Sequence, residues 1–297
     1  MSLLNTTLRF SSLFALSVIV PLSPVDAQTS HDPVLCREGF VQVVSPDAVD
    51  VAQARAAAKK MLAAWQFDLT VMRWARPTDM EGLVTLRLIS DDRMKQESPW
   101  ARAVARGSTF TMGVGLLNDP SVDLTLAHEL GHIQAHRAIG DPKLFVPQYF
   151  REGHGLMMNQ LYADYLHVDR HKGGGGQVHG IMSLTAEEAQ TILTDETYYK
   201  VSDPKEHTKK NNKMEYMGLY FIEYLRVRKN IPDAVPRIGR VFELVGRGKT
   251  YEQAFAHTYG GSLSKTVSEI VAYFRRTETH PEERILGTRF EEYLQPL

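Results

Sequence analysis

The chain has 297 residues, of which 43% are hydrophobic and 23% are charged, and its formal net charge is −1. This composition is ordinary for a globular protein, and the near-neutral balance excludes a strongly basic nucleic-acid-binding protein. The length is sufficient for one large domain or for two closely packed lobes.

The N-terminal segment has the pattern of a secretory signal peptide. Arg9 is followed by an apolar run over residues 10–22, and Val25-Asp26-Ala27 resembles a cleavage site with small residues. The run is too short and too broken by Ser and Pro for a good membrane span. We therefore expect residues 1–27 to be removed near Ala27, and the mature protein to be secreted or periplasmic, without integral membrane association.

The first part of the mature chain alternates between strand-like and helical patterns. Residues 39–44 form a strand candidate, and residues 47–65 have the composition of a helix. Apolar and polar residues alternate over 68–74 and 83–90, as in half-buried strands, and residues 109–117 form a further extended candidate.

From residue 121 onward the pattern becomes helical. Two polar stretches, 172–177 with its glycines Gly173–Gly176 and 203–213 with its lysines and asparagines, are predicted to be surface loops. The predicted helices cover residues 121–138, 147–167, 185–193, 213–229, 234–245, 250–258 and 262–276.

These patterns predict an α+β fold. A strand-rich N-terminal lobe (28–120) would pack on a helix that carries the functional site. The rest of the chain (121–297) would form a helical C-terminal lobe. Both lobes belong to one predicted metallopeptidase-like domain, residues 28–297.

The strongest functional signal is the string H-E-x-x-H formed by His128, Glu129 and His132. Residues four apart share one face of a helix, so both imidazoles can reach a single metal ion. Glu129 lies about 100° further round the helix, where it can take a proton from a metal-activated water. Cys36 is the only cysteine, so a cysteine-based zinc site and an intramolecular disulfide are excluded.

A catalytic zinc ion usually has a third protein ligand. The metzincin pattern is absent, because Ala135 and Ala138 stand where it requires Gly and His. Glu152 is the preferred candidate, since a loop after the first helix would let the next helix turn back and face the two histidines. His154 is an alternative, either as a ligand or as a group that faces the substrate.

The string LAHELGH, followed by a Pro-x-aromatic-aromatic-x-Glu-Gly segment, resembles the gluzincins, particularly the peptidase MA-like group related to thermolysin and the zinc aminopeptidases. The resemblance covers roughly residues 80–276 and implies that Glu152 is the third zinc ligand. It also implies an oxyanion-stabilising Tyr three residues before Gly218. That position holds Glu215, so Tyr216, one step further on, is our candidate. Arg151 and Gly155 depart from the residues usual in this family.

Two further features are candidates for supporting roles. Asp164 could orient a ligand histidine through its second ring nitrogen, or be a solvated carboxylate on a helix. Residues 110–116 could form an edge strand that pairs with an extended substrate.

We therefore expect zinc-dependent hydrolysis of peptide bonds, with a peptide or protein as substrate and no nucleic-acid partner. His128, His132 and Glu152 would hold Zn²⁺, Glu129 would act as the general base, and Tyr216 would assist. The alternative is a non-catalytic secreted module that binds peptides in a metal-dependent way. The presence of Glu129 argues against it, because metal binding alone does not need this base.

Overall fold

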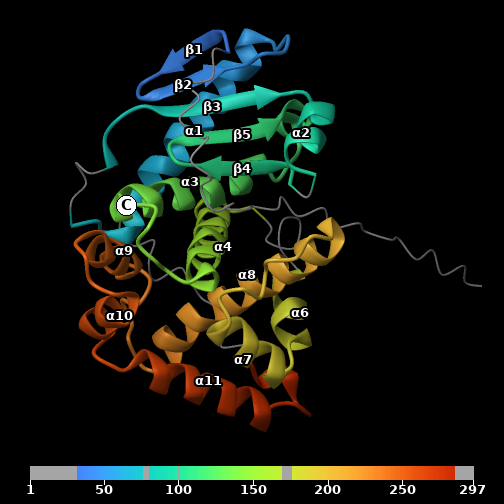
Figure 1. Ribbon diagram of the computed structural model, residues 1–297. Helices are drawn as coiled ribbons and strands as arrows, with labels where there is room; N and C mark the ends of the chain where they lie inside the picture. Colours follow the sequence, from blue (N-terminus) through green and yellow to red (C-terminus); the bar gives the residue numbers. More distant parts are fainter. Residues whose placement is uncertain (1–31, 76–79, 100, 169–175, 285–297) are drawn as a thin grey trace, which may run out of the picture.

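A computed structural model describes residues 32–75, 80–99, 101–168 and 176–284 of the chain. A five-stranded sheet formed by the N-terminal part packs against helices that make up most of the remainder (Figure 1), which confirms the predicted α+β class. The predicted signal peptide, residues 1–27, lies outside the described residues, as do residues 172–175 of the glycine-rich loop. The two predicted lobe boundaries stay predictions.

The sheet is mixed, and its order is β1-β2-β3-β5-β4. The pairs β2/β3 and β3/β5 are parallel, whereas β1/β2 and β4/β5 are antiparallel. The prediction of an edge strand at 110–116 is therefore wrong: β5 is an inner strand, and β4, which the sequence pattern missed, forms the edge. The strands are β1 (Val34–Glu38), β2 (Val41–Val44), β3 (Val84–Ile89), β4 (Ala103–Arg106) and β5 (Thr109–Gly113).

Helix α1 (Val51–Met72) packs against β1, β2 and α3. Asp50 caps its N-terminus by accepting hydrogen bonds from two backbone amides. The helix continues through most of 68–74, so the predicted strand there is wrong. Phe67 and Val71 are buried four residues apart, and this helical spacing outweighs the short alternation in the sequence.

Helices α3 (Val122–Ile139) and α4 (Gln148–Tyr165) form the centre of the molecule. Helix α3 lies beneath the β4 edge of the sheet, and α4 lies between α3 and α8 (Figure 1). Gly140, with a φ of 74°, ends α3, and residues 140–147 lead the chain into α4. This is the turn back that the sequence predicts.

The remaining helices cover the other side of α4 and one corner of the sheet. Helix α8 begins ten residues earlier than predicted, because Asp203 caps it and Pro204 takes its first position; the predicted loop at 203–213 is wrong. These helices are α2 (Asp91–Glu97), α6 (Gly176–Ser183), α7 (Ala186–Thr194), α8 (Pro204–Val227), α9 (Ile238–Gly246), α10 (Tyr251–Tyr259) and α11 (Leu263–Arg276), with short 3₁₀ turns at Val114–Asn118 and Pro281–Arg284.

Helices α4 and α8 touch at a pair of glycines. A Cβ atom on Gly153 would collide with the backbone of Gly218, and one on Gly218 would collide with the backbone of Gly153 and of Tyr149. Only glycine permits backbones to approach this closely. The contact fixes the turn of α8 just before Gly218, and therefore Glu215, beside α4.

One large apolar core runs from the sheet through α1 and α3 to the C-terminal helices. A small second cluster, made of Ile89, Met94, Ala101 and Val104, lies by α2. Within the described ranges, no helix combines the length and the apolar character that crossing a lipid bilayer requires.

Candidate metal centre

The middle of α3 carries His128, Glu129 and His132, and all three side chains are buried, with 4%, 0% and 2% of their surface exposed. The two histidines are four residues apart, so they share one face of the helix. Their Nε2 atoms are 3.0 Å apart. Two imidazole nitrogens therefore point at nearly the same place in the interior.

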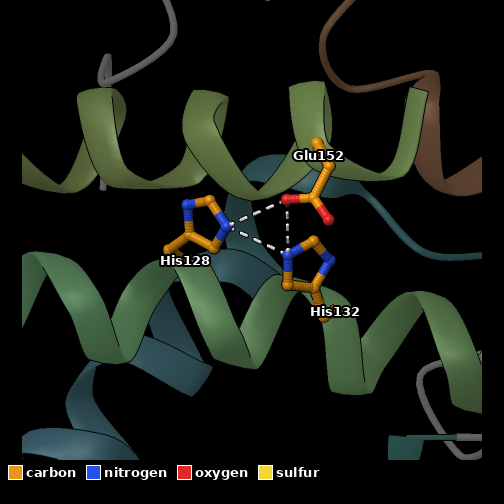
Figure 2. A group of neighbouring side chains, drawn as sticks. All are labelled: His128, His132 and Glu152. Carbon is orange, nitrogen blue, oxygen red and sulfur yellow. Dashed lines mark hydrogen bonds and ion pairs between the residues drawn. The ribbon is translucent and has the colours of Figure 1, made fainter. Parts of the chain in front are cut away.

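Glu152 reaches the same place from α4, as Figure 2 shows. Its Oε2 atom lies 3.6 Å from Nε2 of His128 and 3.4 Å from Nε2 of His132. The three donor atoms all lie within 4.8 Å of one another. This buried group could hold a metal ion, and it unites the three residues that the sequence predicts as ligands.

The spacing of these atoms fits a small divalent ion. Two ligands at 2.0–2.1 Å from a tetrahedral zinc ion would be roughly 3.3 Å apart, close to the three separations above. Oε2 of Glu152 has no hydrogen-bond partner among the described residues. Gly155 leaves room in front of the nitrogens, because a Cβ atom there would lie 2.7 Å from Nε2 of His128 and 3.0 Å from Nε2 of His132.

Gln148 holds Glu152 in place. Its Nε2 donates a 2.6 Å hydrogen bond to Oε1 of Glu152, so Oε2 is the oxygen that faces the histidines. Groups that hold a metal ligand from behind in this way fix its direction. The sequence analysis missed Gln148, although its position four residues before Glu152 on one helix is a usable signal.

Charge in the group is strongly interdependent. Burial opposes the cationic form of His128, but Glu152, Glu215 and Glu129 outweigh it and raise the pKa of His128 to about 9. Burial likewise opposes ionisation of Glu152, but the two histidines outweigh it and lower its pKa. Without a metal, a proton shared by these residues meets the need for positive charge. A cation that binds there must displace that proton.

Glu215, from α8, is a second buried carboxyl group at this site that sequence reasoning missed as a site residue. It is 3% exposed and accepts a 2.8 Å hydrogen bond from Nδ2 of Asn211. Burial, together with the negative charges of Glu152 and Glu129, raises its pKa. The sequence marks its position, three residues before Gly218, but only the contact between α4 and α8 brings it to the histidines.

Tyr216 is not part of the group of metal-binding candidates. Its ring packs against Gly180 of α6, where an added Cβ atom would collide with it. Burial and the nearby Glu215 raise the pKa of Tyr216 to about 12, so its hydroxyl keeps its proton at neutral pH. Its predicted role at an oxyanion stays a prediction.

The two other candidates lie elsewhere. His154 is fully buried on α4, but its ring packs against Trp74 and Phe242, with centroid distances of 6.4 and 5.3 Å, and it is not in the metal-binding group. Its prediction as a ligand is wrong. Asp164 follows Glu152 by twelve residues on α4, about 18 Å along the helix axis. This separation does not fit a role in orienting either histidine.

Comparison with protein-family models gives no matching family, and comparisons with curated proteins and with solved structures give no match either. The resemblance to the gluzincins therefore rests on the motif residues alone. What the chain does has to be argued from the geometry of this site.

Proposed function

We propose that this protein is a zinc-dependent peptidase, and that the resemblance of its motif to the gluzincins reflects a shared chemistry. The observation that carries the proposal is the convergence of three donor atoms, from His128, His132 and Glu152, within 4.8 Å of one another in the interior. Glu129, a fully buried carboxylate, follows the first of these ligands on the same helix.

Zinc is the metal that suits this donor set best. Two imidazoles and one carboxylate are a common catalytic zinc set, and they leave one position for water or substrate. When bound, zinc would polarise the scissile carbonyl and lower the pKa of a water molecule in the site to about 7.

Glu129 would act as the general base. It would accept a proton from water as the water oxygen bonds to the carbonyl carbon, and return the proton to the nitrogen as the C–N bond breaks. The products are a carboxylic acid and an amine. The Tyr216 hydroxyl remains our candidate donor to the developing oxyanion; packing against α6 means that it would need to turn towards the site.

The substrate would lie along β4. This strand ends the sheet and pairs on one side only, with β5, while α3 packs directly beneath it. Peptides commonly bind by adding a strand to such an edge. An extended peptide on β4 would bring its backbone past the two histidines.

We also propose that the protein is exported, as the pattern of residues 1–27 indicates. N-terminal sequencing of protein recovered from outside the cytoplasm should then give a start near residue 28. A start at Met1 would contradict this.

The decisive test of the activity combines elemental analysis with peptide hydrolysis. We expect about one zinc ion per chain, cleavage that a chelator abolishes, and restoration by zinc. Glu129→Gln should keep the zinc and lower the hydrolysis rate by about 10²- to 10⁴-fold. Glu81→Gln, at an exposed loop position, is the matched control and should behave as wild type. Cleavage that neither the chelator nor Glu129→Gln affects would exclude the proposal. Zinc-dependent peptide binding without cleavage would indicate the non-catalytic module instead.

A further inference from the structure

A cavity of about 180 Å³ opens beside the candidate metal centre. His132 and Gln148 of the centre line it, together with Ala105 and Arg106 of the edge strand β4. A peptide placed along β4 would therefore extend one of its groups into this cavity close to the metal ligands.

The cavity is rich in positive charge. Its described lining includes Arg106, Lys143 and Arg151, against a single carboxylate, that of Glu196. Arg106, Lys143 and Glu196 are exposed at the rim, whereas Arg151 is largely buried. The inner charge of the cavity therefore comes from Arg151, which directly precedes the ligand Glu152.

Arg151 lacks the partners that an arginine in this position normally has. Its Nε atom is buried without a hydrogen bond, and its guanidinium makes no ion pair with any described residue. In contrast, Arg87 pairs with two carboxylates and Arg284 donates to backbone carbonyls. Buried cationic groups are costly unless they are paired. The guanidinium of Arg151 is thus a binding group that is free to receive an anion.

The cavity is one end of a longer groove. A second cavity, of about 570 Å³, shares the lining residues Phe145, Gln148, Glu196 and Tyr199 with the first. It continues past α7 to the start of α10 and α11. Such a groove fits an extended chain, not a compact small molecule.

We propose that this cavity is a subsite for a carboxylate of a peptide substrate, with Arg151 as the group that binds it. The proposal deepens the proposed peptidase function and rests on it for the nature of the chain. The carboxylate can come from an Asp or Glu side chain or from the C-terminus of the substrate. In either case the planar guanidinium can donate two parallel hydrogen bonds to it.

The test measures binding, not cleavage, on the zinc-loaded Glu129→Gln protein. Fluorescein-labelled, alanine-rich peptides would carry Glu, or the isosteric Gln, at one position at a time, and fluorescence anisotropy would give each Kd. We expect one position at which Glu binds about 10- to 100-fold more tightly than Gln, because hydrogen bonds to charged groups contribute this much. Each peptide is made with a free and an amidated C-terminus. A preference that follows the side chain identifies an acidic residue as the ligand, and one that needs the free terminus identifies a terminal carboxylate.

Variants then assign the preference to Arg151. In the same protein, Arg151→Gln should reduce the Glu-to-Gln ratio to about one, whereas Arg151→Lys should keep part of it. Arg55→Gln removes an exposed arginine on the far side of α1, one that pairs with Glu38, and should leave the ratio unchanged. Circular dichroism would show that each variant is folded.

The outcomes separate the two proposals. Equal binding of Glu and Gln peptides at every position, no binding at all, or a preference that persists in Arg151→Gln would overturn the subsite. If the preference holds and depends on Arg151 but wild-type protein cleaves none of the peptides, the subsite stands and the peptidase function fails. Cleavage of neutral and acidic peptides at equal rates by wild type would instead remove the subsite alone.

Discussion

The two sides of α4 treat buried polar residues in opposite ways. Glu152 and His154 are two residues apart, and both side chains are fully buried. Glu152 faces the imidazoles of His128 and His132, whereas His154 packs against the aromatic ring systems of Trp74 and Phe242. We call these the metal-site side and the aromatic side of α4.

Charge separates the two sides. On the metal-site side, the histidines hold the pKa of Glu152 below its usual range, so the carboxylate stays ionised despite burial. On the aromatic side, burial, with the positive charge of His132 and His128, lowers the pKa of His154 to about 3, so this imidazole stays neutral. Burial alone therefore does not identify a functional residue. What matters is whether neighbouring donors converge on one point.

The largest effect should come from the matched substitutions Glu152→Leu and His154→Leu. Glu152→Leu removes a direct ligand, and even residues behind a ligand cost about 10- to 100-fold in metal affinity. We expect its zinc affinity to fall by more than about 100-fold. His154→Leu should keep zinc affinity within about threefold and leave the folded state at least as stable, because neither ring nitrogen of His154 has a hydrogen-bond partner among the described residues.

Competition against a chromophoric chelator measures both affinities, and urea unfolding measures both stabilities. Equal losses of zinc in the two variants would mean that the aromatic side also holds the metal, and the contrast between the two sides would be lost.

A smaller effect should follow from Gln148→Leu. The variant loses the 2.6 Å hydrogen bond that turns Oε2 of Glu152 towards the histidines, so zinc affinity should fall by about 10- to 100-fold. Gln134→Leu is the control: Gln134 is equally interior on α3, but it donates to the backbone of Trp65, away from the metal group. That variant should lower stability without changing zinc affinity. The same chelator competition decides, and a loss in Gln134→Leu as large as that in Gln148→Leu would contradict the assignment.

The sequence was a good guide to the metal-site side. The spacing of His128 and His132 needs only a helix, and Glu152 needs only that the next helix turn back, which the break at Gly140 provides. Residues whose position depends on a third element could not be predicted in this way. Glu215 reaches the site through the glycine contact between α4 and α8, and the Arg151 cavity needs β4 and the loop after α3 as well.

The errors in the fold have a similar origin. Residues 68–74 alternate like a strand because Asp68, a polar residue, is buried within a helix, so polarity did not report exposure there. Strands β1 and β4 are only five and four residues long, too short for a clear period, and they depend on pairing with their neighbours. Missing β4 also misplaced the edge strand.

Asp68 gives the last and smallest expected effect, one confined to stability. Burial raises the pKa of this carboxyl well above its usual value, and the indole N–H of Trp74 offsets this only in part, without reaching hydrogen-bond geometry. The folded protein therefore binds a proton that the unfolded chain releases near pH 4. Asp68 favours folding fully only below that pH, and its contribution is lost as pH rises towards the raised folded-state pKa. Asp68→Asn does not titrate, so its free energy of unfolding should exceed that of wild type by at least about 1 kcal/mol at pH 8, and by less at pH 5. Urea unfolding at both pH values measures this, with the exposed Asp92→Asn as a control that should follow the wild-type profile. Because Asp68 lies near Trp74 on the aromatic side, zinc affinity should not change; a change would mean that the two sides of α4 are coupled through the helix.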